Sequence, residues 1–203
     1  MRSRTVIAAL AGVALLLAGG CAEATESVAD SAPRSTPQEP GKHDMPPPVV
    51  VIADDPAAPI TLTIGDTSAP TDPVATDAAG VLLPPQDVSR LGWWADSSLP
   101  GSGAGSIVVT GHIDDIAQGD GFAARFAGLS EGDEVALELG DGSSRRYRVD
   151  RVMSVGKDGE LPLGELNRLD GPETLMLVTC GGEFVGPPLG YANNDFVFAT
   201  PLT

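Results

Sequence analysis

The sequence from Ile60 onwards predicts an all-β domain, either a sandwich or a barrel. Short runs of β-forming residues are separated by Gly, Pro and Asp, and only two stretches have helical character. Between Val135 and Val155 apolar and polar residues alternate around a GDGS turn at 140–143, a pattern typical of a hairpin. The expected strands cover 60–64, 81–85, 106–112, 133–139, 145–155, 174–180 and 195–199, with short helical segments at 122–129 and 161–169.

The N-terminus has the pattern of a lipoprotein-type signal peptide, predicted at residues 1–20. Arg2 and Arg4 precede an apolar run at 6–18, which is too short for a comfortable transmembrane helix, and small residues follow it. Cys21 comes directly after these small residues and resembles the cysteine of a bacterial lipobox, although Ala18 stands where that pattern has Leu. We therefore expect Cys21 to be lipidated, the alternatives being an uncleaved anchor or plain secretion.

Residues 21–57 are rich in Pro, Ala, Ser and acidic residues, which predicts a disordered tether ahead of a domain at 58–203. His43 lies in this tether and is expected to be solvated. The whole chain has a formal net charge of −16, and loss of Arg2 and Arg4 with the signal peptide lowers this by two, to about −18. Such a charge excludes nucleic acid as a partner, because phosphate binding needs a basic surface.

The stretch TLMLVTCGG at 174–182 places a cysteine at the end of a predicted buried strand. Two glycines follow Cys180 and permit a sharp exit of the chain. Most buried cysteines are small core residues, but a thiol at the open end of a rigid strand is well placed to react. With Cys21 lipidated, Cys180 is the one free thiol of an exported protein. These observations favour a reactive Cys180 over a structural one.

His112 is the candidate partner of Cys180, because it also ends an apolar run and is the only histidine of the domain. A thiol is a weak nucleophile until an imidazole takes or holds its proton, and such pairs meet in space despite a separation of 68 residues (180 minus 112). Asp114 is a candidate for orienting the ring, although it also suits a solvated loop. The histidines and cysteines are too scattered for zinc and the acids for calcium, so no metal or cofactor is expected.

Four segments, taken in order, resemble one family. They are VLLPPQDVSRLGWWADSSLPGSGAGSIVVTGHIDD at 81–115, FAARFAGLSEGDEVALELGDGSSRRYRV at 122–149, LMLVTCGGEF at 175–184 and GYANNDFVFA at 190–199. Together they look like a sortase, the cysteine transpeptidase of Gram-positive cell surfaces, and specifically the class F type of actinobacteria. The resemblance covers about residues 58–203.

The resemblance implies a closed eight-stranded β-barrel with short helices. It also implies that the Cys180 thiolate attacks the threonine carbonyl of an LPxTG-like sorting signal, and that His112 protonates the leaving amine. A peptidoglycan-precursor amine then resolves the thioacyl enzyme. Such an enzyme would work outside the cytoplasm, facing the cell wall, with the lipid on Cys21 holding it to the membrane. Of the adjacent Trp93 and Trp94, we expect one core ring and one ring lining the substrate groove.

The sequence departs from the family at one residue. Sortases have an arginine shortly after the cysteine, near the start of the last strand, but no Lys or Arg follows Cys180. Asn193 or Asn194 is the expected neutral substitute, and the loss of one oxyanion donor costs roughly 2.7–4 kcal/mol, so the enzyme is expected to be weakened. Arg146 or Arg148 could reach the site, although strand alternation favours a solvated face for both. The alternative function is a catalytically degenerate sortase-fold lipoprotein that binds surface-protein or cell-wall peptides.

Overall fold

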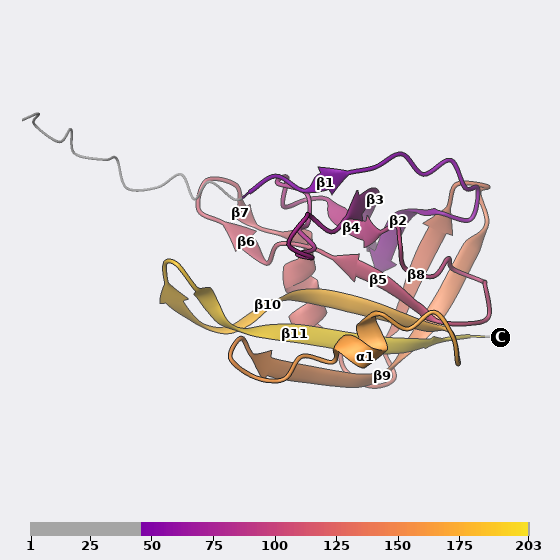
Figure 1. Cartoon of the computed structure of the whole chain (residues 1–203). Helices are drawn as coiled ribbons and strands as arrows, with labels where there is room; N and C mark the ends of the chain where they lie inside the picture. The colour runs from indigo at the N-terminus through magenta and orange to yellow at the C-terminus, as the bar shows by residue number, and fades with distance from the viewer. Residues whose placement is uncertain (1–45, 203) are drawn as a thin grey trace, which may run out of the picture. The chain divides into compact units, whose positions relative to one another are not determined.

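The computed structural model describes residues 46–202, which are mostly β-strand (Figure 1). The long strands are β2 (Pro59–Ile64), β3 (Thr67–Ala75), β4 (Leu91–Trp94), β5 (Ser106–Thr110), β8 (Glu134–Leu139), β9 (Ser144–Gly156), β10 (Thr174–Gly186) and β11 (Gly190–Pro201). The short elements are β1 (Val49–Val50), β6 (Asp114–Asp115), β7 (Gly119–Asp120), the 3-10 helix η1 (Phe122–Gly128) and the α-helix α1 (Leu163–Leu166). Neither helix in this part of the chain has the length and apolar character needed to span a bilayer.

The eight long strands form a closed barrel. Their order around the ring is β3-β2-β8-β9-β11-β10-β5-β4, and β4 pairs with β3 to close it. Two pairings, β5 with β10 and β3 with β4, are parallel, and the other six are antiparallel. The prediction of a closed eight-stranded β-barrel with short helices is therefore confirmed.

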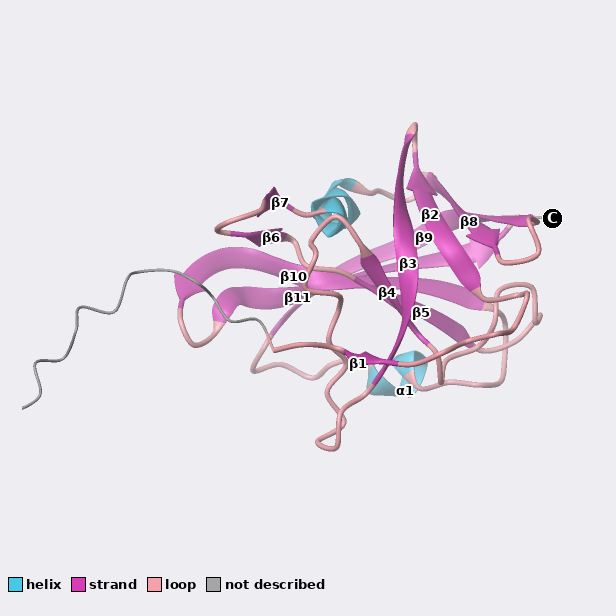
Figure 2. Ribbon diagram, turned by 90° about the horizontal axis from the view of Figure 1, so that it is seen from above, coloured by secondary structure: helices cyan, strands magenta, loops and turns pink. Residues whose placement is uncertain are grey.

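Strand β10 is buried on both faces, which explains its uninterrupted apolar sequence. Leu175 and Leu177 belong to the core cluster inside the barrel, whereas Met176 and Val178 belong to a second cluster with Phe196 of β11. The two helices pack against different clusters and lie on different sides of the barrel (Figure 2). Helix η1 contributes aromatic side chains to the inner cluster, and α1 packs Leu166 against the outer one.

Two barrel strands were not expected from the sequence, and one expected strand is absent. Strand β3 contains Pro70 and Pro73, which lack the N–H that a ladder needs and argue against a strand. It forms because its first half pairs with β2 and its second half with β4. Strand β4 is only four residues long. The expected strand at 81–85 was wrong, since Leu82 makes no more than an isolated bridge with Thr76.

The paired part of the chain begins before residue 58. Val49 and Val50 form β1 and pair with Ala75 and Val74 of β3, so the last residues of the predicted tether 21–57 are attached to the barrel. The predicted signal peptide at 1–20 and the lipidation site Cys21 lie outside the described residues.

A buried carboxylate fixes the end of β10 that is remote from Cys180. Glu173 is 5% exposed and accepts hydrogen bonds from Tyr147 Oη at 2.8 Å and from the backbone N–H groups of Gly101 and Gly103 at 3.0 and 2.6 Å. Burial, together with this hydrogen bond, raises the pKa of Tyr147 well above its usual value, so the phenol remains a donor. Glu173 therefore ties the loop before β5 to the start of β10, and the two strands begin in register.

Candidate active site

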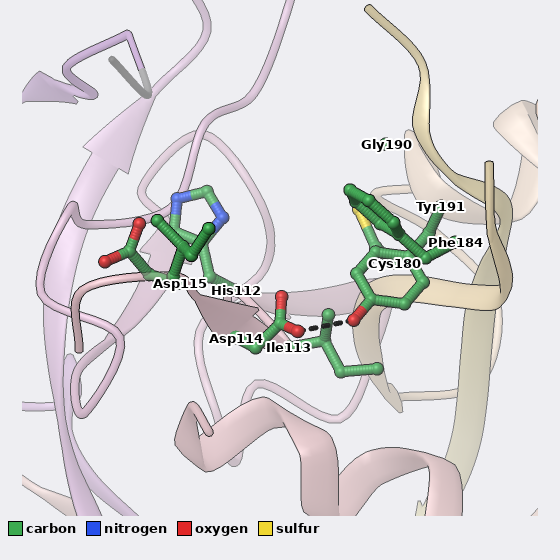
Figure 3. A pocket seen from close by; sticks show the side chains of 9 residues that line it. His112, Ile113, Asp114, Asp115, Cys180, Phe184, Gly190 and Tyr191 are labelled. Carbon is green, nitrogen blue, oxygen red and sulfur yellow. Dashed lines mark hydrogen bonds between the residues drawn. The ribbon is translucent and has the colours of Figure 1, made fainter. Parts of the chain in front are cut away.

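The parallel pairing of β5 with β10 brings His112 and Cys180 together. Thr110, the last residue of β5, pairs with Val178, and His112 and Cys180 each come two residues after a member of this pair, so the 68-residue offset is the same for both pairs. Two positions is also the side-chain repeat of a strand. His112 and Cys180 line one pocket of about 320 Å³, and Figure 3 shows them on facing walls.

The sequence predicted that this strand ends at Cys180. That prediction was wrong, because β10 continues to Gly186. After Gly181 its pairing with β11 becomes irregular, and the hairpin of the two strands extends beyond the barrel towards β6 and β7 (Figures 1 and 2). A Cβ on Gly181 would overlap the carboxylate of Asp195, so a larger residue here would require that side chain to move. The glycines thus permit a bulge in a continuing strand, and Cys180 lies immediately before it.

Gly111 fixes the position of His112. A Cβ there would lie 2.5 Å from Leu91 Cδ2 and 2.7 Å from Ala123 Cβ, closer than side chains tolerate. The buried hydroxyl of Thr179 donates to the carbonyl of Gly111 at 2.9 Å. The segment that carries His112 is therefore packed against the barrel and bonded to the residue preceding Cys180.

The imidazole of His112 is half-buried and has an unpaired nitrogen. Within residues 46–202, Nε2 is buried and has no hydrogen-bond partner. Burial lowers the pKa of His112 below its ordinary value, against the opposing charges of Asp115 and then Asp114. The neutral ring is thus favoured near pH 7, and in this form the imidazole can accept a proton.

Asp114 hydrogen-bonds to a tyrosine that sequence reasoning missed. Tyr191 Oη donates to Asp114 Oδ2 at 2.5 Å, which joins the β10–β11 hairpin to the segment after His112 (Figure 3). This hydrogen bond, with burial, raises the pKa of Tyr191 to about 12. Phe184 packs its ring edge-on against Tyr191, with 5.3 Å between the centroids. The sequence signal for Tyr191 was its place in the segment GYANNDFVFA, but nothing there indicates its partner. Asp114 as the group that orients His112 stays a prediction.

The two candidate asparagines lie on opposite faces of β11. Asn194 pairs directly with Cys180, which puts the two side chains on the same face of the sheet. Asn193 points the other way, and its Nδ2 donates to Ser154 Oγ at 2.9 Å. The other candidate donors are engaged elsewhere, since Arg146 and Arg148 both pair with Glu134 of β8.

A second hollow of about 410 Å³ approaches Cys180 along the outer face of the barrel. Its floor is formed by β5, β10 and β11, and one wall by the segment that includes α1. We call it the outer groove; its lining includes Trp94, Val108, Thr110, Leu161, Leu166, Val178, Asn194 and Phe196. Trp93 lies in the barrel core and Trp94 lines the outer groove, as expected for one core ring and one groove ring; that this groove binds the substrate stays a prediction. Among residues 46–202, no Lys or Arg lines either this groove or the pocket at Cys180.

The thiol of Cys180 is free and partly exposed. Its surroundings, an imidazole on the facing wall and a groove along its own strand, suit nucleophilic attack on a bound acyl group. Within residues 46–202, no group of three or more His, Cys, Asp or Glu side chains is placed to hold a metal ion.

Comparison with known proteins agrees with this arrangement. The sortase domain family matches residues 62–202. Among solved structures, sortase C1 of Streptococcus agalactiae is 19% identical with a TM-score of 0.55, covering 74% of this chain and 71% of that one. Sortase C-1 of Actinomyces oris is 20% identical with a TM-score of 0.54, covering 70% and 72%. No curated protein matches the sequence.

These structural likenesses show the fold, and the family match extends over most of the chain, including both Cys180 and His112. The chain therefore belongs to the sortase family of cysteine transpeptidases.

Proposed function

We propose that this protein is a class F sortase that cleaves an LPxTG-like sorting signal through a thioacyl intermediate on Cys180 and transfers the protein to a cell-wall amine. The observation that carries the proposal is the β5–β10 register, which delivers His112 and Cys180 to one pocket. The class F assignment rests on the four sequence segments given above.

The outer groove suits the peptide before the cleaved bond. It passes Val178 of β10 and reaches Asn194, the cross-strand partner of Cys180, and its apolar floor and α1 wall match the leucine and proline that begin such a signal. An extended peptide in this groove would present its threonine carbonyl to the thiol.

His112 is suited to move the protons of the reaction. The neutral His112 ring takes the proton of the Cys180 thiol, the thiolate attacks the threonine carbonyl, the peptide bond breaks, and the imidazolium gives this proton to the leaving glycine amine. Because burial favours the neutral ring, His112 readily gives up this proton and can then accept one from the incoming amine.

Asn194 is the better placed substitute for the family arginine. It is opposite Cys180 on the same face and lines the outer groove, whereas Asn193 is bonded to Ser154 on the other face. Its amide N–H can donate to the developing oxyanion but supplies no charge, so we propose a working but weakened enzyme.

We further propose that the enzyme acts outside the cytoplasm, held to the membrane by a lipid on Cys21. This follows from the N-terminal sequence pattern and from the sorting reaction, whose substrates are exported proteins.

Replacing either Cys180 or His112 should abolish transfer. The full chain, C180A and H112A would be incubated with an LPxTG-type peptide and glycinamide, and adducts followed by intact-protein mass spectrometry. We expect a thioacyl adduct and a transfer product in the wild type, none in C180A, and a loss of about 10²-fold or more in H112A. Cleavage by C180A would contradict the proposal, and binding without any adduct would indicate a degenerate peptide-binding module.

The pKa of His112 should lie below 6.5 and fall further in D115N. Burial disfavours the imidazolium, while the Asp115 carboxylate supports it, so removing that charge lowers the pKa again. The unfolded chain then binds the proton more tightly, and folding stability decreases as pH falls from about 6.5 towards the folded-state pKa. Titration of the ring protons by NMR measures both values, with H43Q assigning the other histidine. A wild-type pKa above 6.5, or a rise in D115N, would be the opposite result.

Arginine at position 194 should strengthen the enzyme. In N194R a guanidinium group would lie beside Cys180, and we expect turnover to rise about tenfold. This is less than the factor of about a hundred or more by which removal of one oxyanion donor lowers kcat. N193R is the matched control, because it adds the same charge on the other face of β11 and should not raise turnover. A gain in N193R alone, or in neither variant, would show that Asn194 does not occupy the oxyanion position.

A further inference from the structure

We propose that the pocket shared by Cys180, Asp114 and Tyr191 receives the amine acceptor, and that Asp114 selects acceptors whose ammonium group is remote from any carboxylate. This inference rests on the function proposed above and adds a specificity-determining residue to it. We call this pocket the acceptor pocket; it is the 320 Å³ pocket of Figure 3.

Two hollows of different character lie near Cys180, which lines one of them and whose cross-strand partner Asn194 lines the other. The outer groove lies on the side of Val178 and is lined mainly by apolar side chains. The acceptor pocket lies on the other side, between the segment after His112 and the β10–β11 hairpin. If the acyl chain fills the outer groove, the second substrate must reach the thioester from the acceptor pocket.

The charges of the acceptor pocket favour a cation. Asp114 and Asp115 both line it, and no Lys or Arg from the described part of the chain does. The Asp115 carboxylate is engaged in a turn, accepting from the backbone N–H groups of Ala117 and Gln118 at 3.0 Å each. Asp114 is bonded only through Oδ2, to Tyr191, and no other residue in the described part of the chain hydrogen-bonds to its Oδ1. This oxygen is therefore available to an ammonium group.

The hydrogen bond from Tyr191 holds the Asp114 carboxylate in a position where it can bind an ammonium group. The Tyr191 phenol holds one carboxylate oxygen at 2.5 Å, and Phe184 packs edge-on against the phenol ring. The carboxylate thus stays in place without a cationic partner, and a bound ammonium would not have to displace an ion pair. Loss of the phenol would loosen Asp114 but leave its charge.

The reaction is balanced with the residues present. The acceptor enters as an ammonium beside Asp114 and releases one proton to water. The free amine attacks the thioester carbonyl, the C–S bond breaks with its electron pair going to Sγ of Cys180, and the nitrogen passes its second proton to His112. An amide forms, and the imidazolium returns its proton to the thiolate, which restores the neutral pair.

The same carboxylates repel an acceptor that carries its own carboxylate near the amine. Free glycine should therefore be a poorer acceptor than glycinamide, by about fivefold or more for one partly buried charge interaction. The natural acceptor is then an amine attached to an amide or to a long side chain, and not a free α-amino acid.

The charge selection can be measured at Cys180 without any peptide. The full chain would be labelled with cationic trimethylammonioethyl methanethiosulfonate, anionic sulfonatoethyl methanethiosulfonate and neutral methyl methanethiosulfonate, with peptide mass mapping to separate Cys180 from Cys21. We expect D114N to lower the cation-to-anion rate ratio about fivefold, after normalisation to the neutral reagent. The matched control E138Q removes one exposed acid from β8, which contributes nothing to the pocket, and should leave the ratio unchanged.

Acyl transfer supplies the second readout. D114N should raise the acceptor KM and reduce the preference for glycinamide over glycine about fivefold, measured as a ratio on the preformed thioacyl enzyme so that any change in the rate of acylation cancels. Y191F should transfer more slowly yet retain the preference, because the charge remains. Unchanged ratios in D114N, with a normal thioacyl enzyme, would overturn the acceptor assignment and leave the proposed function standing. A changed reagent ratio without any thioacyl enzyme in the wild type would instead contradict the proposed function.

Discussion

The parallel contact between β5 and β10 is the constraint on which the site depends. Parallel neighbouring strands run in the same direction, so two residues that lie the same number of positions beyond a paired couple come to the same end of the sheet. The pairing of Thr110 with Val178 therefore determines that His112 meets Cys180. Burial of β10 on both faces holds this register, because a slip by one residue would exchange the contents of the inner and outer clusters.

The environment of the thiol follows from this placement. Along β10 the outer face is apolar, which produces a groove where an extended peptide can lie. Beyond Cys180 the bulge turns the hairpin towards β6, and the second hollow is bordered by Asp114 and Asp115. A transpeptidase must hold an acyl donor and an amine at one carbon, and two dissimilar hollows, one lined by Cys180 and the other by its cross-strand partner Asn194, are suited to both.

Local sequence patterns predicted those strands whose own residues show a clear β pattern, whichever strands they pair with. The run before Cys180 and the alternating hairpin at 134–156 are examples. Strand β3 was missed because its prolines are tolerated only through pairing with two different neighbours, which no local pattern shows. The site residues were recognised from their types and from the family segments. The Tyr191–Asp114 bond and the choice between the asparagines depend on register across β11, which emerges only in the folded barrel.

The central claim is that His112 and Cys180 act as one unit. The most direct test is the rate at which neutral methyl methanethiosulfonate modifies Cys180 at pH 7, in the wild type and in H112A, with circular dichroism to verify that both are folded. An imidazole that takes up the thiol proton accelerates this reaction, so we expect the variant to react at least about tenfold more slowly. Equal rates in the two folded proteins would contradict the account, because Cys180 would then react without His112.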